Sequence, residues 1–176
     1  KQYVIENNLK SLVLGVSGGL DSAVVAAICQ EKYIGVPLIG ISIPMNSTND
    51  HKEKAKWVGK TFCSVFEEFE EWDNDIRVPL GNTEEDGYMV GDEPKKVYDY
   101  IFDLLEKTNS IAERAGFTTE EFPKNILKGN MKARIRMITL YDMARKTNGM
   151  VLSTGQRSED EFSNFFTLHG DVGDFS

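Results

Sequence analysis

The residues best suited to chemistry form a short run near the start of the chain, Ser17-Gly18-Gly19-Leu20-Asp21-Ser22. Two adjacent glycines let the backbone turn with positive φ and let a ligand approach without a Cβ in its way. The amide hydrogens of such a turn, with those of a following helix, can converge on phosphate oxygens. Ser17 and Ser22 add hydroxyl donors, and Asp21 is a hard oxygen ligand of the kind that Mg²⁺ prefers. The run therefore predicts a nucleotide phosphate site.

The turn differs from a Walker loop, which places a Lys directly before its Ser or Thr. The octet from Gly15 to Ser22 carries no cation. Phosphate charge must therefore be neutralised by a metal ion and by residues elsewhere in the chain. A plain strand-to-helix turn, with Asp21 as an N-terminal helix acid, is the alternative. The serines on both sides and the apolar stretch before the turn favour the phosphate site.

The elements that must position this turn follow from the apolar pattern. Residues 4–9 predict a short lead-in helix, and residues 12–16 predict a strand covered by helices on both faces. A helix begins at Asp21, continues through Ile28 and is closed by Gly35 and Pro37. The turn is thus expected between a buried strand and a helix.

Strands and helices continue to alternate along the chain. Residues 38–43 predict a second buried strand, residues 47–50 cap a helix through Phe62, and residues 64–69 predict a third strand. An acidic loop is expected at 81–93, followed by a helix over 97–115 that ends near Gly116. The fold class is therefore α/β, a single domain with a mostly parallel sheet flanked by helices.

The last predicted elements are a long helix and a short strand. Gly129 is expected to open the helix, which ends at Asn148-Gly149, and residues 150–152 form the strand. An apolar face on this helix would pack on the sheet, while Lys132, Arg134 and Arg136 project elsewhere. Ligands are then expected beyond the carboxyl ends of the strands.

Composition limits the classes of partner and the compartment. The net charge of −8 repels nucleic acid and anionic membranes, so neither is an expected partner. No apolar run reaches the roughly 20 residues that span a bilayer, which predicts a cytoplasmic protein. Cys29 and Cys63 lack metal-ligand spacing and are expected to be buried free thiols. The 176 residues start without Met, and we expect that they lack a C-terminal part.

The run SGGLDS resembles the pyrophosphatase loop of the N-type ATP pyrophosphatases, which split ATP between its α and β phosphates. That loop alone does not choose among members such as GMP synthetase, asparagine synthetase and tRNA thiolation enzymes. The later blocks GNMKARIRM (129–137), LYD (140–142), VLSTGQRSE (151–159) and FTLHGD (166–171) resemble NAD synthetase in content, order and separation. This resemblance implies an adenine nucleotide alpha hydrolase-like fold and a homodimer.

The same resemblance implies a reaction and a set of site residues. NAD synthetases use ATP and Mg²⁺ to adenylate deamido-NAD and release pyrophosphate, after which ammonia displaces AMP. By motif position, ATP would be bound by Gly15, Val16, Ser17, Gly18, Gly19, Leu20, Asp21, Ser22 and Thr154. The catalytic carboxylates, which would also hold magnesium, are Asp21 and Glu159. The residues implied to contact deamido-NAD are Arg134, His169, Asp171 and Asp174.

Several assignments keep an alternative. Arg134 could be a solvated helix cation, and Glu159 an ordinary first-turn helix acid. His51 is expected on the surface at a helix start. Leu168 stands where many members carry a substrate-contacting Lys, and the segment that leads to Asp174 is one residue shorter than in the family. Another adenylating enzyme, GMP synthetase-like or tRNA-modifying, and a nucleotide-binding module without turnover are the alternative functions.

Overall fold

The computed structural model describes residues 1–45, 47–69, 107–108, 110–111, 113–116, 124–155 and 173–174. Two compact units make up the chain, one of Lys1–Glu71 with Asn125–Ser176 and the other of Trp72–Lys124. The predicted sheet and the glycine turn belong to the first unit. In the second unit, Gly116 has φ +87° and follows helical residues 113–114, as the sequence predicts for a helix end.

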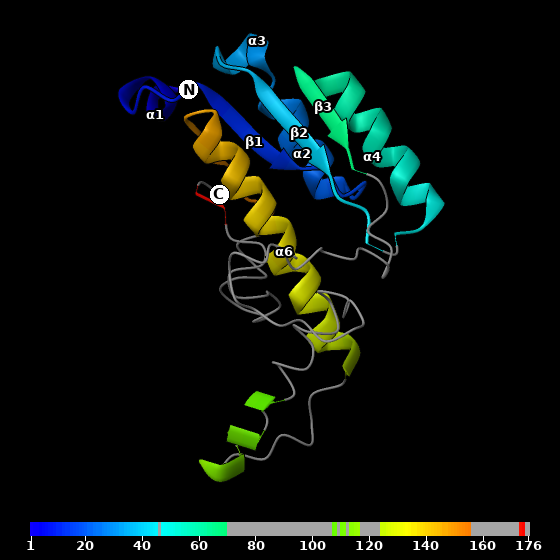
Figure 1. The fold of residues 1–176 in the computed structure, drawn as a ribbon. Helices are drawn as coiled ribbons and strands as arrows, with labels where there is room; N and C mark the ends of the chain where they lie inside the picture. The colour runs from blue at the N-terminus through cyan, green and yellow to red at the C-terminus, as the bar shows by residue number, and fades with distance from the viewer. Residues whose placement is uncertain are drawn as a thin grey trace, which may run out of the picture. The chain divides into compact units, whose positions relative to one another are not determined.

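Strands and helices alternate along the chain (Figure 1). The elements are α1 (Gln2–Glu6), β1 (Ser11–Gly15), α2 (Leu20–Ile28), α3 (Glu31–Ile34), β2 (Leu38–Ser42), α4 (Asn49–Phe62), β3 (Val65–Glu68), α6 (Lys124–Lys146) and β4 (Gly149–Val151). The four strands form a parallel sheet in the order β3-β2-β1-β4. The predicted α/β class with a parallel sheet is confirmed.

Strand β1 lies in the interior of the sheet, with Leu12 paired to Leu38 of β2 on one side and to Met150 of β4 on the other. After β1 the chain moves outward to β2 and β3, and it then returns to the far side of β1 for β4. The strand order therefore reverses between β1 and β4. In open α/β sheets, ligands bind beyond the carboxyl ends of the strands at such a reversal.

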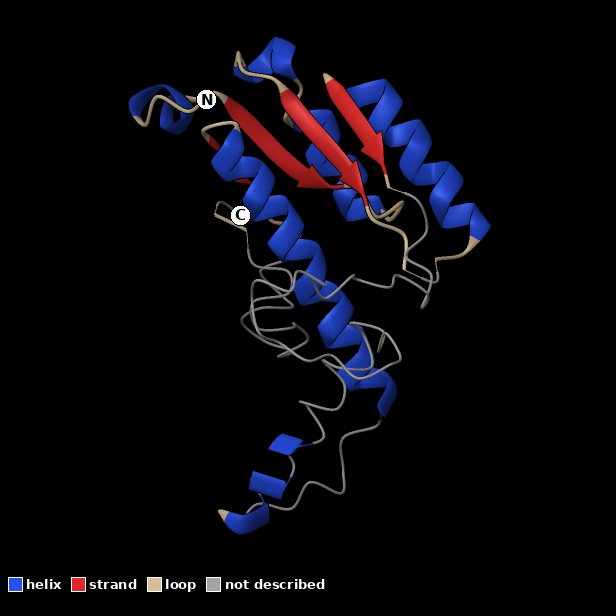
Figure 2. Cartoon of the chain, viewed as in Figure 1, coloured by secondary structure: helices blue, strands red, loops and turns tan. Residues whose placement is uncertain are grey.

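Helices cover both faces of the sheet (Figure 2). Leu12, Leu14 and Val16 pack with residues of α2 and α4, whereas Val13 packs with α6 on the opposite face. Because successive strand side chains point to opposite faces, a strand covered on both sides must be apolar throughout. The continuous apolar run predicted this environment correctly.

Two helix boundaries differ from the sequence prediction. Helix α2 ends at Ile28 rather than continuing toward Gly35, because the backbone of Gln30 is not helical (φ −56°, ψ 144°) and its side-chain Nε2 donates to the Ala27 carbonyl at 2.7 Å. The short α3 follows and ends at Gly35, which has φ +95°. Helix α6 begins at Lys124, not at Gly129. A helical Gly costs only about 1 kcal/mol relative to Ala, so it lowers helix stability without ending the helix.

Other predictions fall into two groups. The capped helix α4 and the strand β3 are confirmed, and Thr48 caps α4 by accepting a bond from His51 N at 3.4 Å. A lead-in helix is present, but it spans Gln2–Glu6 and ends before Leu9. The loop at 81–93 and most of the helix at 97–115 lie outside the described residues.

Among the helices of the described ranges, none has both the length and the hydropathy to cross a membrane.

Candidate functional site

The glycine turn joins β1 to α2 and packs against the start of α4. Gly18 has φ +80°, which side chains other than Gly rarely adopt. A Cβ at this position would lie 2.1 Å from the carbonyl oxygen of His51. Glycine is therefore needed here both for its conformation and for the close approach of the two backbones.

Hydroxyl groups hold the turn in shape. The Ser17 hydroxyl accepts a bond from Gly19 N at 3.2 Å, and the Ser22 hydroxyl donates to the Gly19 carbonyl at 3.0 Å. The two hydroxyl oxygens lie 3.2 Å apart. Ser17 is exposed and lines the cavity described below, whereas Ser22 is buried and stabilises the turn through its hydrogen bonds. Asp21 lies on the exposed side of the first turn of α2.

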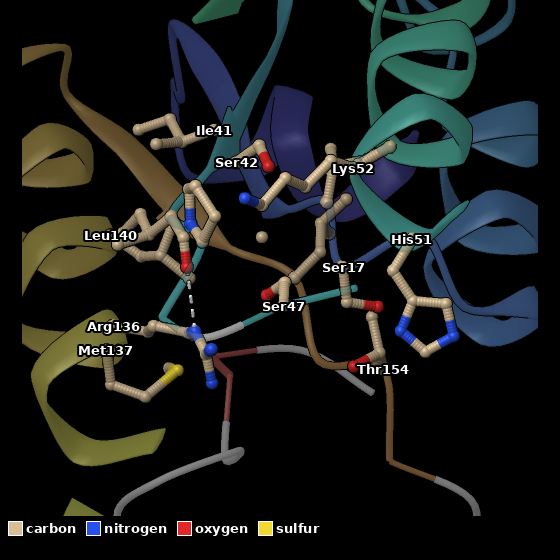
Figure 3. Close-up of a pocket in the computed structure, with 16 residues that line it drawn as sticks. Ser17, Ile41, Ser42, Ser47, His51, Lys52, Arg136, Met137, Leu140 and Thr154 are labelled. Carbon is tan, nitrogen blue, oxygen red and sulfur yellow. Dashed lines mark hydrogen bonds between the residues drawn. The ribbon is translucent and has the colours of Figure 1, made fainter. Parts of the chain in front are cut away.

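A cavity of about 280 Å³ lies next to this turn (Figure 3). Its walls come from the carboxyl ends of β1 and β2, from α4 and α6, and from the segment after β4. The lining residues are Gly15, Val16, Ser17, Ile41, Ser42, Ile43, Pro44, Ser47, His51, Lys52, Ala55, Arg136, Met137, Leu140, Leu152 and Thr154. The cavity therefore lies at the reversal point of the sheet, where a ligand was expected.

The charge of the cavity is opposite to that of the chain as a whole. Lys52 and Arg136 line it, and no Asp or Glu is present among the described residues of its wall. The chain has a net charge of −8. A concave site with one sign of charge attracts ligands of the other sign, so this cavity suits an anion.

Two side chains of helix α6 form hydrogen bonds to the connection between β2 and α4. Arg136 Nε donates to the Ile43 carbonyl at 3.1 Å, which Figure 3 shows as a dashed line, and Lys132 Nζ donates to the Met45 carbonyl at 3.2 Å. Burial lowers the pKa of the Arg136 guanidinium, but an arginine stays charged because its ordinary pKa lies above about 12. Lys132 and Arg136 were expected to project away from the apolar face of the helix, and their long stems let the charged ends reach this loop.

The structure brings several predicted ATP residues together. Gly15, Val16, Ser17 and Thr154 line the cavity, and Gly18 to Ser22 form the adjoining turn and helix start. Arg134 is an exposed residue of α6 and is not part of the cavity wall. Glu159, His169 and Asp171 lie outside the described residues. The shared magnesium site of Asp21 and Glu159 therefore stays a prediction.

Asp174 lies along the outer edge of β4. Its backbone N–H donates to the Val151 carbonyl at 2.8 Å, and its carboxylate accepts a bond from Val151 N at 2.8 Å. The pKa of Tyr141 is raised, first by burial and then by the charge of the Asp174 carboxylate and a hydrogen bond to it. A Cβ on the neighbouring Gly173 would lie 2.3 Å from Ser153 N. Asp174 therefore stabilises β4, and its contact with substrate stays a prediction.

Neither a metal cluster nor an activated thiol is found in the described part of the chain. Groups of three or more His, Cys, Asp or Glu residues that could hold a metal are absent from it. Mg²⁺ needs fewer protein ligands, since it keeps waters and binds through one or two carboxylates and substrate phosphates, so Asp21 fits such a role. Both cysteines are free and partly buried, and burial raises the pKa of Cys63 to about 11. The Cys63 thiol is therefore protonated at neutral pH.

The sequence analysis missed several cavity residues. Ser42, Ser47, Lys52 and Arg136 were not assigned to a site, and His51 was expected only on the surface. His51 is exposed, as expected, and it also lines the cavity. A signal was available, because the polar run 47–52 follows a buried strand at the same sheet edge as the glycine turn.

Comparison with known proteins decides the family. A model of the family described as NAD synthase matches residues 1–77 and 95–175. The chain belongs to the NAD synthase family. The family predicted from the glycine turn and the later sequence blocks is thereby confirmed.

Similar members of the NAD synthase family are described as NH(3)-dependent NAD(+) synthetases. The relative from Finegoldia magna is 32% identical over 173 residues, which cover 98% of this chain and 56% of the relative. The relative from Mycoplasma genitalium is 33% identical over 171 residues, which cover 96% of this chain and 54% of the relative. The chain thus spans about half the length of the curated relatives that it matches.

Solved structures share the fold. An NH3-dependent NAD synthetase from Campylobacter jejuni, in complex with the nitrate ion, superposes with a TM-score of 0.65 at 23% identity. The match covers 99% of this chain and 59% of that one. An NMN synthetase from Francisella tularensis also gives a TM-score of 0.65, at 22% identity, over 99% of this chain and 57% of that one. At 22% and 23% identity these likenesses show the fold alone.

Proposed function

We propose that the chain provides the ATP-binding part of an ammonia-dependent NAD synthetase. The reaction adenylates the nicotinate carboxylate of deamido-NAD, releases pyrophosphate and forms the amide when ammonia displaces AMP. One observation carries the proposal: the glycine turn and Thr154, far apart in sequence, meet at a cation-lined cavity at the reversal point of the sheet. Membership of the NAD synthase family and the relatives' descriptions support the same activity.

The described residues supply binding and positioning. Amide hydrogens of the glycine turn and the Ser17 hydroxyl donate to phosphate oxygens, and the apolar side chains of Ile41 and Leu140 offer a surface for a purine base. Holding the α-phosphate in line with the attacking carboxylate converts a bimolecular step into one within a complex, which contributes several kcal/mol (about 7–11 in well-oriented model reactions). No protein nucleophile is required, consistent with the raised pKa of Cys63.

Magnesium is part of the proposal. Asp21 and Glu159 would hold the ion, which would supply positive charge to stabilise the departing pyrophosphate. Asp21 supports this role because its carboxylate lies on the exposed side of the first turn of α2, directly after the glycine turn. Arg134, His169, Asp171 and Asp174 are the proposed contacts to deamido-NAD.

The proposed oligomeric state, location and class of substrate come from the family resemblance and from the composition of the chain. We propose a homodimer, as the resemblance to NAD synthetase implies, and a cytoplasmic location. Residues 1–176 would belong to one NAD synthetase domain. The net charge of −8 supports small-molecule substrates and argues against nucleic acid as a partner.

Product analysis tests the activity. The full chain is incubated with ATP, Mg²⁺, ammonium and deamido-NAD, and the expected products are AMP, pyrophosphate and NAD in equal amounts. ATP binding without AMP release would favour a nucleotide-binding module. AMP release that depends on xanthosine monophosphate or on tRNA would favour the alternative adenylating enzymes.

A substitution tests the metal role. Asp21→Ala should abolish Mg²⁺-dependent turnover and leave the thermal unfolding midpoint nearly unchanged, because Asp21 is an exposed first-turn residue. Asp50→Ala is the matched control, since Asp50 is an exposed acid in the first turn of α4. Turnover that survives Asp21→Ala at the level of the control would contradict the role of Asp21 in holding magnesium.

A further inference from the structure

The glycine turn needs positive charge from elsewhere in the molecule, and α4 provides it. The octet that forms the turn contains no Lys or Arg. Lys52, in the first turn of α4, lines the cavity next to the turn and is partly buried. Figure 3 shows its side chain extending over the cavity toward Ser42. A cation from a second element therefore faces the space where a nucleotide would lie.

The backbone holds Lys52 close to the turn. The approach of Gly18 to the His51 carbonyl leaves no room for even a Cβ, so the start of α4 packs directly on the glycine turn. Thr48 caps the helix through the N–H of His51. Lys52 follows His51 in the chain, and its position relative to the turn is set by these contacts rather than by a mobile loop.

Lys52 differs from the other lysines of α4. Lys54, Lys56 and Lys60 are exposed, whereas Lys52 is partly buried. Lys52 is the one α4 lysine that lines the cavity. Arg136, the other cation of the cavity wall, uses its Nε to hold the Ile43 carbonyl. A flexible ammonium is a compact point charge that suits phosphate oxygens, as in the P-loop.

We propose that Lys52 binds the polyphosphate of ATP and supplies the charge that a Walker loop obtains from its own Lys. This inference rests on the proposed ATP site and adds a residue to it. Lys52 helps to hold the triphosphate in the cavity while the glycine turn provides the amide donors. It is a specificity determinant, because it favours the triphosphate over an uncharged nucleoside.

Binding measurements on the full chain test the inference. Calorimetry gives the Kd of ATP and of adenosine for the unaltered chain, Lys52→Met, Lys52→Arg and the control Lys60→Met. Lys52→Met should weaken ATP binding about tenfold or more, which is the scale of one hydrogen bond to a charged group, and change adenosine binding less than about twofold. Lys52→Arg should retain most of the ATP affinity, and Lys60→Met should match the unaltered chain.

The outcomes separate this inference from the proposed function. Equal ATP affinity for Lys52→Met and the unaltered chain would overturn the role of Lys52 and leave the ATP site intact. Equal loss of ATP and adenosine binding would also overturn it, because Lys52 would then only shape the cavity. If the unaltered chain binds no ATP, the proposed function and the inference both fail. Lys52→Arg guards against a folding defect, since it keeps the charge and the long stem.

Discussion

Gly18 must be glycine for two physical reasons, its backbone conformation and the close approach of a second backbone segment. Its φ of +80° lies in the left-handed region, and its Cα faces the His51 carbonyl at a distance that excludes a side chain. Only the first reason applies to Gly35, since it has φ +95° and nothing lies within 4 Å of a Cβ built there. The two residues therefore separate the effect of conformation from that of close packing.

Alanine substitutions at these two glycines should differ in a measurable way. Gly35→Ala should lower the free energy of unfolding by about 1–2 kcal/mol, the conformational term alone, without a change in ATP affinity. Gly18→Ala should add a displacement of α4 and weaken ATP binding by more than about tenfold, a change of about 1.4 kcal/mol in binding. Chemical denaturation and calorimetry give the two quantities. Equal effects of both substitutions on ATP affinity would contradict the importance of the Gly18 contact.

Helix α6 acts on the cavity through its side chains as well as through its apolar face. Met137 and Leu140 pack on the sheet, while Lys132 and Arg136 donate to carbonyls of the β2–α4 connection. That connection contributes Ile43, Pro44 and Ser47 to the cavity. Helix α6 therefore packs on the sheet and also holds the connection that lines the cavity.

Removal of the Arg136 guanidinium should loosen the connection. Arg136→Met keeps an unbranched apolar stem but leaves the Ile43 carbonyl without this donor, which should cost about 1–3 kcal/mol of stability. Hydrogen exchange at the amides of Ile43 and Met45 should accelerate, and ATP binding should weaken. Arg145→Met, in the exposed last turn of the same helix, should change these quantities little. Exchange rates at Ile43 and Met45 that match the control would show that α6 does not restrain the connection.

At the scale of the whole molecule, the local and the overall charge have opposite signs. The cavity wall carries Lys52 and Arg136, whereas the chain carries a net charge of −8. Small anions can enter a local positive site, but an extended polyanion meets the field of the entire surface. This contrast favours a nucleotide over a nucleic acid as the ligand.

Fluorescence anisotropy with labelled tRNA tests the contrast. The full chain should show no binding at about 0.15 M salt, where the Debye length is about 8 Å, while ATP binding persists under the same conditions. Competition by tRNA against ATP should also be absent. Salt-dependent tRNA binding would contradict this expectation and favour the tRNA-modifying alternative.

Local patterns in the sequence were sufficient for the elements and for the chemistry of the turn. The continuous apolar run of β1 reports burial on both faces, and two glycines after it report a turn that a ligand can approach. Motif blocks from Gly129 to Asp171 identified the family, because their order and separation are specific. The apolar run and the glycine turn depend on near neighbours in the chain, whereas the motif blocks are recognised by their order and spacing along it.

Only the tertiary structure decided which residues share the cavity. The strand order places β4 beside β1, so Thr154 meets Ser17, and the close contact at Gly18 brings Lys52 to the same site. Arg136 donates to the Ile43 carbonyl, and Asp174 accepts a bond from the Val151 amide. The spacing of apolar residues along a helix or strand does not predict such contacts with other elements. The spacing of apolar residues along the sequence predicts whether a residue is buried or exposed. Its partners depend on the order of the strands and on the reach of long side chains, which emerge when the sheet assembles.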